Sequence, residues 1–173
     1  MENKASSKST ILNYGLYFGI ITVLISVVKY AMDAQYTQEW YSGVAGIIAM
    51  IVLIIMGLKS FRNSNITMTF GQGVKIGIGI TFIGTLMIIA YYALFGFVIE
   101  PDFKMKSLEA QKTVLADVWG MTDAQIEEAT KSSADYFYLS TFGGIFIFNL
   151  FLGGITSLIA GAVMKRAEVD TYL

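Results

Sequence analysis

The feature that most constrains this chain is a long uncharged segment in its middle. Between Lys75 and Glu100 lie 24 residues without a charged side chain. At a rise of roughly 1.5 Å per residue, a helix of this length crosses a hydrocarbon core of about 30 Å with some tilt. Pro101 follows directly, and a proline disfavours helical geometry in the residue before it. The segment therefore predicts a membrane-spanning helix over about 74–99.

Three further uncharged runs cover residues 11–28, 41–58 and 136–164. The first is longer than the roughly 7 to 15 apolar residues of a cleavable signal, and no small-x-small cleavage site follows it, so we expect a retained span. We predict an all-α integral membrane protein with a single domain over residues 1–173. Its four spans cover about 11–30, 41–58, 74–99 and 137–164.

The amino-acid composition excludes several classes of function. Hydrophobic residues make up 55% of the chain and charged residues 14%, against about a quarter charged in soluble domains. The absence of cysteine and histidine excludes disulfides, thiolate catalysis, Ser-His-Asp triads and His or Cys metal sites. A net charge of −1 leaves no basic stripe for nucleic acid. We therefore predict no catalytic, cofactor or metal residues.

The spans themselves contain no carboxylate, histidine or proline. Ion-coupled carriers need ionisable groups within the membrane, and many secondary transporters use spans that a proline breaks into half-helices. The usual machinery of such carriers is therefore absent.

Basic residues are biased toward the side that holds both termini. That side carries Lys4, Lys8, Lys59, Arg62, Lys75, Lys165 and Arg166, and the other carries Lys29, Lys104, Lys106, Lys112 and Lys131. Because basic residues near spans favour the cytoplasmic side, we predict cytoplasmic termini.

The segment between the third and fourth spans, about 102–135, is predicted to form an extracytoplasmic amphipathic helical hairpin. Gly120 separates the two helices, and Thr122 with Gln125 has the pattern of a capping box. The hairpin is interpreted either as a lid or spacer, or as a docking surface for an envelope partner. Apolar residues at helical spacing on the first helix are Met105, Leu108, Leu115, Val118 and Trp119, and the candidate partner surface is Leu108, Leu115, Trp119 and Ile126.

Small residues recur at helix-contact spacing within the spans. They indicate either packing inside the bundle or a face left for self-association or a partner's helix. Asn149 is interpreted as a hydrogen-bonding residue at a helix interface or as a substrate contact, and Lys29 and Lys75 as lysines that extend to the headgroups. The packing candidates are Gly15, Gly19, Gly73, Gly77, Asn149, Gly153, Ser157 and Gly161, with Gly43 and Gly46 as a similar pair.

Carboxylates offer two weaker patterns. Asp123, Glu127 and Glu128 could attract a divalent cation, but no calcium-binding loop accompanies them, so a solvated helix face is the simpler interpretation. Glu100 and Asp102 lie at the membrane boundary, where they either hold a metal or end a helix.

Several motifs resemble a known family. They are Phe70-Gly71-Gln72-Gly73 with Lys75 and Gly77, Glu100-Pro101-Asp102-Phe103, Gly120-Met121-Thr122, and Gln125-Ile126-Glu127-Glu128. With these motifs the chain resembles the domain of unknown function 4199 family, small four-span membrane proteins found mainly in Bacteroidetes. The likeness covers the second half of the chain by motif and the first half by hydropathy. It implies a bacterial inner-membrane address, no established activity, and a lipid-carrier glycosyltransferase as a candidate partner.

Two hypotheses of function follow. The first is a non-enzymatic accessory or scaffold protein that lies in the lipid bilayer and packs with a membrane-protein partner. The alternative is a homo-oligomeric channel or carrier for a small or lipidic solute, suggested by Asn149, Thr81 and Thr85 within apolar spans. An enzyme using Glu100 and Asp102 is a weaker third hypothesis.

Overall fold

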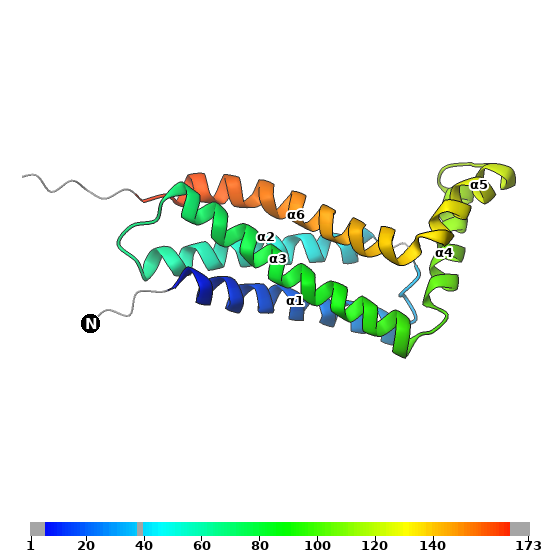
Figure 1. Cartoon of the computed structure of the whole chain (residues 1–173), viewed down its shortest axis with the longest axis horizontal. Helices are drawn as coiled ribbons and strands as arrows, with labels where there is room; N and C mark the ends of the chain where they lie inside the picture. The colour runs from blue at the N-terminus through cyan, green and yellow to red at the C-terminus, as the bar shows by residue number, and fades with distance from the viewer. Residues whose placement is uncertain (1–5, 38–39, 167–173) are drawn as a thin grey trace, which may run out of the picture.

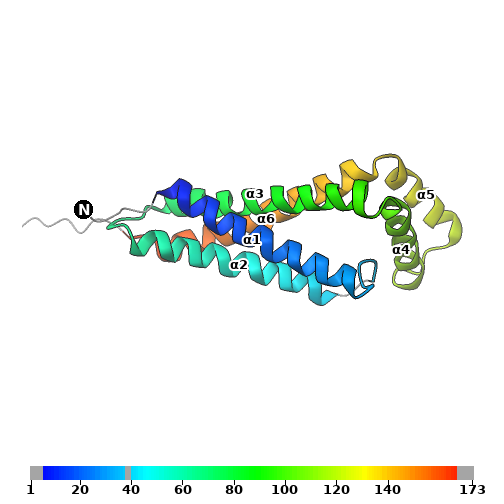
Figure 2. The ribbon, with the colours of Figure 1, turned by 90° about the horizontal axis from the view of Figure 1, so that it is seen from below.

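The described part of the chain is a bundle of long helices with two shorter helices at one end. The computed structural model describes residues 6–37 and 40–166. The four helices α1, α2, α3 and α6 lie along one axis, and each is long and apolar enough to cross a membrane (Figures 1 and 2). The all-helical, four-span prediction is therefore confirmed. In chain order the elements are α1 (Ser7–Ala31), α2 (Trp40–Asn63), α3 (Phe70–Leu94), η1 (Phe95–Ile99), α4 (Phe103–Asp117), α5 (Asp123–Asp135) and α6 (Phe137–Met164).

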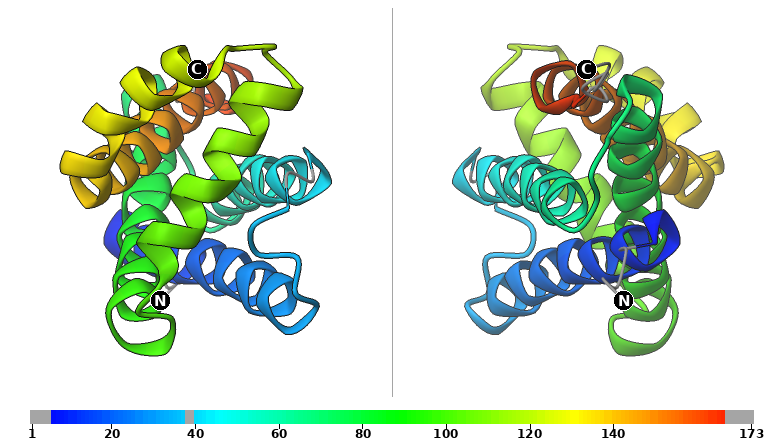
Figure 3. Two further views of the ribbon diagram at one scale, coloured as in Figure 1. Left: turned by 90° about the vertical axis from the view of Figure 1, so that its right-hand side faces the viewer. Right: turned by 90° about the vertical axis from the view of Figure 1, so that its left-hand side faces the viewer.

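Helix α3 is the centre of the bundle. It packs against α1, α2 and α6, and Figure 3 shows it flanked by α1 and α6, with α2 to one side. Its buried positions form two adjacent rows at four-residue spacing, which is the spacing at which side chains of a helix share a face. One row carries Gly73, Gly77, Thr81 and Thr85, and the other carries Ile76, Ile80, Gly84 and Ile88.

The first row of α3 meets a row of small residues on α6. A Cβ placed on Gly73 would lie 3.0 Å from the Cα of Gly161, and one on Gly77 would lie 2.7 Å from the Cβ of Ser157. One turn further, Gly153 faces the side chain of Thr81. The pairs advance by four residues in opposite directions along the two helices, as expected for antiparallel neighbours. Small residues thus let the two backbones approach closely, which in lipid is a main source of helix association.

Helices α1 and α3 interlock in a parallel register. Gly15 and Gly19 of α1 receive the side chains of Ile83 and Met87 of α3. In return, Gly79 of α3 receives Ile11 of α1. Each helix therefore supplies both the side chains and the spaces they fill.

Helix α2 packs along only half of its length. All of its buried residues lie between Met50 and Phe61, and none lies between Trp40 and Ala49. Among the described residues, a Cβ placed on Gly43 or Gly46 would meet nothing within 4 Å. Of the two interpretations of this pair, packing inside the bundle is therefore not supported by the structure, and a face for self-association or a partner's helix stays a prediction. We call the half of the bundle near Ser7 and Met164 the closed half, and the half near α4 and α5 the open half.

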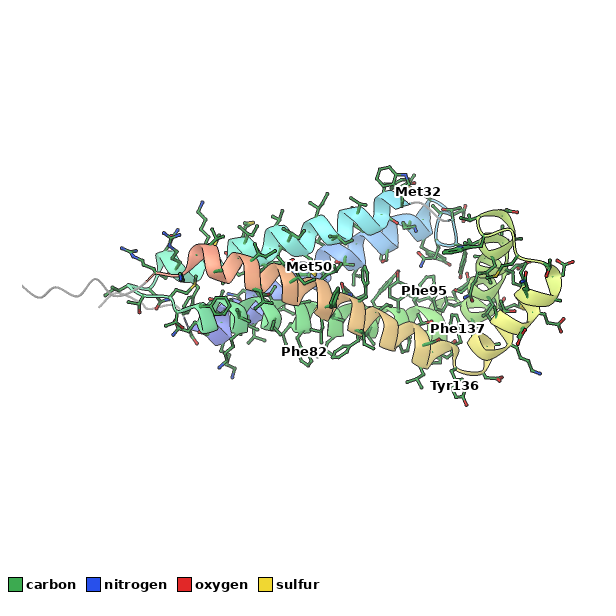
Figure 4. The ribbon with its side chains drawn as sticks, turned by 90° about the horizontal axis from the view of Figure 1, so that it is seen from above. Met32, Met50, Phe82, Phe95, Tyr136 and Phe137 are labelled. Atoms are coloured by element: carbon green, nitrogen blue, oxygen red, sulfur yellow. The ribbon has the colours of Figure 1, made fainter. Side chains whose placement is uncertain are left out.

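Helices α4 and α5 lie across the end of the open half (Figures 1 and 2). Gly120 links them with a φ of 61°, a left-handed conformation that favours glycine. The π-helical turn η1 ends α3 just before Glu100 and Pro101. Buried Phe95, Phe103 and Phe137 then join α3, α4 and α6 in one aromatic cluster, whose labelled members Phe95 and Phe137 point inward in Figure 4.

Side-chain caps set two helix starts. Thr69 and Gln72 form a full capping box at α3, with bonds of 3.2 Å from the Gln72 amide to Thr69 Oγ1 and 2.9 Å from the Thr69 amide to Gln72 Oε1. At α5, the Thr122 amide donates to Gln125 Oε1 at 3.0 Å, while the Thr122 hydroxyl donates to the same oxygen instead of capping the helix. The predicted box at Thr122 is therefore half formed.

Candidate functional site

The open half contains a cavity between all four spans. Its volume is about 240 Å³, and it lies where α2 has no buried side chains. Phe18, Ile88 and Phe148 contribute apolar walls, and Gly43 and Gly46 leave space on the α2 side. Six polar residues also line it: Thr22, Ser26, Lys29, Ser42, Tyr92 and Asn149.

Lys29 is the cation of this site. Its half-buried side chain reaches from α1 to α2, where Nζ donates to Ser42 Oγ at 3.3 Å. In the described part of the chain the one ion pair is Lys106 with Glu100, so no described carboxylate neutralises Lys29. Lys29 was expected to extend to the lipid headgroups, and in the structure its side chain instead contacts α2.

The hydroxyl groups of α1 are mostly satisfied by their own helix. Thr22 Oγ1 donates to the carbonyl of Phe18 at 2.9 Å, and Ser26 Oγ donates to the carbonyl of Thr22 at 3.2 Å. Ser26 Oγ also lies 3.4 Å from the hydroxyl of Tyr92 on α3. These groups present oxygen lone pairs to the cavity more than free donors.

Asn149 brings an amide to the deepest part of the cavity. Twelve residues into α6, it lies roughly 18 Å from the helix start, near the middle of a bilayer. Its Nδ2 donates to the carbonyl of Ile145 at 3.0 Å, within α6. The same antiparallel register that pairs Thr81 with Gly153 places Asn149 one rung further, opposite Thr85. Thr85 is fully buried, and its Oγ1 has no hydrogen-bond partner among the described residues.

The other packing candidates lie in helix contacts. Gly15 and Gly19 meet α3 from α1, and Gly73 and Gly77 meet α6 from α3. Gly153, Ser157 and Gly161 of α6 all contact α3. In the described structure these residues therefore face other helices of the same chain.

A second hollow of about 690 Å³ lies between α4 and α5. Charged side chains of both signs border it, including Glu109, Lys112, Glu127 and Lys131. Of the four candidate partner residues, Ile126 is buried at 8% exposure, and Leu108 and Leu115 are half-buried. Trp119 is 71% exposed.

The spacing of the apolar residues in and after α4 predicted that they share one face of an amphipathic helix. In the structure they are not all buried together. Met105 and Val118 are 64% and 72% exposed, and Trp119 is similar, whereas Leu108 packs against the aromatic cluster. The buried side of α4 is anchored instead by Phe103.

The carboxylates at the membrane boundary make structural contacts. Glu100 pairs with Lys106 at 3.1 Å. Asp102 occupies the position before α4, but its side chain makes no capping hydrogen bond. Across the residues that the structure describes, no group of three or more carboxylates is placed to hold a metal ion.

Tyr36 connects the α1–α2 loop to this end of the bundle. Its ring lies 6.3 Å from that of Phe103, and Lys106 Nζ lies 5.9 Å from its ring centre. Burial, assisted by the negative charge of Glu100, raises the pKa of Tyr36 to about 12. Its buried hydroxyl has no hydrogen-bond partner among the described residues.

The cavity was missed from the sequence, although a signal was present. Thr22, Ser26 and Lys29 recur at intervals of four and three residues, so they lie on one face of α1. Read as a polar stripe within an apolar span, they indicate a hydrated or liganded helix face. What the sequence did not show is that the first half of α2 stands away from this stripe.

These features define a multi-pass helical membrane protein with a polar cavity between its spans. The family model described as "Protein of unknown function (DUF4199)" matches residues 13–166, so the chain belongs to this family. No curated protein and no solved structure matches the chain.

Proposed function

We propose that the chain is a non-enzymatic accessory or scaffold protein of the bacterial inner membrane that packs with another membrane protein. The observation that carries this proposal is the exposure of apolar side chains outside the spans, namely Met105, Val118 and Trp119 of the α4 region. Exposed tryptophan and methionine are enriched at protein interfaces. A lipid-carrier glycosyltransferase is the partner that the family resemblance implies.

The α4–α5 segment is the more suitable partner surface in this proposal. The glycine faces predicted from the sequence on α1, α3 and α6 are already filled by neighbouring helices of the same chain. We therefore assign docking to an amphipathic α4–α5 hairpin on the extracytoplasmic side, with both termini in the cytoplasm.

The charge distribution supports this orientation. Lys8, Lys59 and Arg62 lie near the ends of spans on the closed side, where basic residues favour the cytoplasm. Because the chain lacks cysteine, single cysteines can report the topology. Thr113→Cys should react with an impermeant maleimide on intact spheroplasts and Ser64→Cys only after lysis; the reverse pattern would overturn the orientation.

The partner proposal can be tested with the two tryptophans as a matched pair. Trp119 and Trp40 are 71% and 78% exposed at the same end of the molecule, but only Trp119 lies in the α4–α5 segment. After extraction in mild detergent, we expect a stoichiometric membrane protein to co-purify with wild type and Trp40→Ala. We expect Trp119→Ala to lose most of it. Purification of the chain alone or as a homo-oligomer would contradict the proposal.

A second candidate function is a homo-oligomeric channel or carrier for a small or lipidic solute. The observation that favours it is the polar cavity, which reaches Asn149 deep in the bundle. Reconstituted vesicles should then show flux of ions, small solutes or labelled lipid above that of empty vesicles. Equal flux in both would exclude this function.

A further inference from the structure

We propose that the cavity of the open half binds the phosphate headgroup of an anionic phospholipid, which reaches it between α1 and α2 from the leaflet next to α4 and α5. This inference concerns binding alone, and it stands whether or not the chain has a protein partner.

The first argument is charge. Lys29 lines the cavity, and no described carboxylate lies within ion-pair distance of its ammonium group. An ammonium group has three N–H donors, and the bond to Ser42 uses one of them. A half-buried cation with free donors inside a membrane protein favours an anionic acceptor, because charged groups removed from water are normally paired. Phosphate oxygens are such acceptors.

The second argument is the route to the site. A separate hollow of about 520 Å³ lies between α1 and α2, and it shares Ile25, Lys29 and Ser42 with the cavity. The hydrogen bond from Lys29 to Ser42 therefore stands at the boundary between the two spaces. The other walls of this hollow include the exposed apolar side chains of Ile21, Leu24, Val28 and Met32.

The combination matches an amphiphile with one polar and one apolar part. An acyl chain would lie along the apolar hollow, while the phosphate would lie against Lys29 at the boundary of the two spaces. The hydroxyl groups of the headgroup would donate to the oxygen lone pairs that line the polar cavity. Gly43 and Gly46 keep the α2 wall open, since a Cβ at either position would meet no atom within 4 Å in the described part of the chain. Met32, labelled in Figure 4, marks the end of α1 where the hollow lies.

The aromatic cluster lies on the α4 side of the cavity. Phe95, Phe103 and Phe137 pack together there, and Tyr92 of the cavity wall packs against them. The hollow that borders the cavity lies on a different side, between α1 and α2, where an acyl chain would enter from the bilayer.

The test is native mass spectrometry of the detergent-solubilised full chain, titrated with phosphatidylglycerol, phosphatidylcholine or inorganic phosphate. We expect phosphatidylglycerol to bind at one saturable site, with about tenfold preference over phosphatidylcholine. Lys29→Gln should weaken phosphatidylglycerol binding about tenfold, a change of about 1.4 kcal/mol. Lys75→Gln is the matched control, because Lys75 is the exposed lysine near the start of α3 at the opposite end, and it should bind as wild type does.

Gly46→Leu gives a second, independent variant. It fills space in the cavity without removing charge, and it should also weaken binding of phosphatidylglycerol. This variant decides the question if Lys29→Gln does not fold. Equal phosphatidylglycerol binding by wild type, Lys29→Gln and Gly46→Leu would show non-specific lipid and overturn the proposal. Displacement of phosphatidylglycerol by inorganic phosphate at equal concentration would also overturn it, in favour of a free anion.

Discussion

The closed and open halves of the bundle contain the same four helices but use small residues in opposite ways. In the closed half, glycines such as Gly77 and Gly153 are filled by side chains of the neighbouring helix. In the open half, Gly43 and Gly46 face space that none of the described side chains fills. Glycine spacing alone thus does not distinguish a tight contact from a cavity wall. A tight contact forms only where the neighbouring helix carries side chains at positions that fit against the glycines.

The largest effect should come from breaking the closed half. Gly77→Leu places a side chain where Ser157 already lies, with Cβ atoms about 2.7 Å apart, so α3 and α6 must separate. Overpacking of this kind costs about 1–3 kcal/mol and occasionally more. The measurement is the midpoint of unfolding when a denaturing detergent is titrated into mixed micelles.

The control for this prediction is Gly43→Leu in the open half. No atom of the residues that the structure describes lies within 4 Å of its added Cβ, so we expect the midpoint to stay close to that of wild type. Equal losses at the two positions would contradict the division of the bundle into a closed and an open half.

Sequence reasoning predicted the helices well and the shape of the bundle less well. The uncharged stretch ending at Glu100 is sufficient to identify a span, because bilayer thickness sets the length of a spanning helix. The packing of α2 is different, since its first half is uncharged like residues 50–58, yet only residues from Met50 onward are buried. In lipid an apolar face is stable whether or not another helix covers it, so hydropathy does not report where the helices diverge.

The candidate site shows the same limit. Lys29 was recognised as a lysine near the end of a span, but its contact with Ser42 depends on how α1 and α2 turn toward each other. Asn149 was recognised as the polar residue deep in a span, whereas its place in a cavity depends on the unpacked part of α2. Both residues were visible in the sequence, and only the tertiary arrangement brings them together.

A smaller change in the free energy of unfolding is expected from two threonines of α3, which mark where the closed half ends and the open half begins. Thr81 and Thr85 are successive rungs of the same row on α3, but only Thr81 has a hydrogen bond, from Oγ1 to the carbonyl of Gly77 at 3.1 Å. Thr81→Val removes that bond and should lower the free energy of unfolding by about 0.5–1.5 kcal/mol. Thr85→Val replaces a buried, unpaired hydroxyl with a methyl group of similar shape, so stability should stay equal or rise.

The measurement is again the unfolding midpoint in mixed micelles, with the two variants compared directly. A loss for Thr85→Val as large as that for Thr81→Val would mean that the Thr85 hydroxyl has a partner in the membrane, such as water held in the cavity. Thr81 and Thr85 would then both have hydrogen-bonded hydroxyls. The boundary between the closed and the open half of the bundle would have to be placed nearer to the closed end.

The smallest effect concerns the loop that joins α1 and α2 above the open half. The pKa of Tyr36 is about 12 in the folded protein, against about 10 for an unperturbed tyrosine. Below pH 10 the hydroxyl is protonated in both the folded and the unfolded chain, so the stability associated with this group is fully present. Between about pH 10 and pH 12 the unfolded chain releases the proton first, so stability falls as the pH rises.

Tyr36→Phe should flatten this part of the pH profile and leave neutral stability unchanged or slightly higher, because the buried hydroxyl has no described partner. Tyr136→Phe, at an exposed position of the same end, serves as the control and should retain the wild-type profile. If Tyr36→Phe loses stability with pH as steeply as wild type, the loop does not hold the tyrosine against α4, and the open half is looser at its end than the packing of Tyr36 on Phe103 indicates.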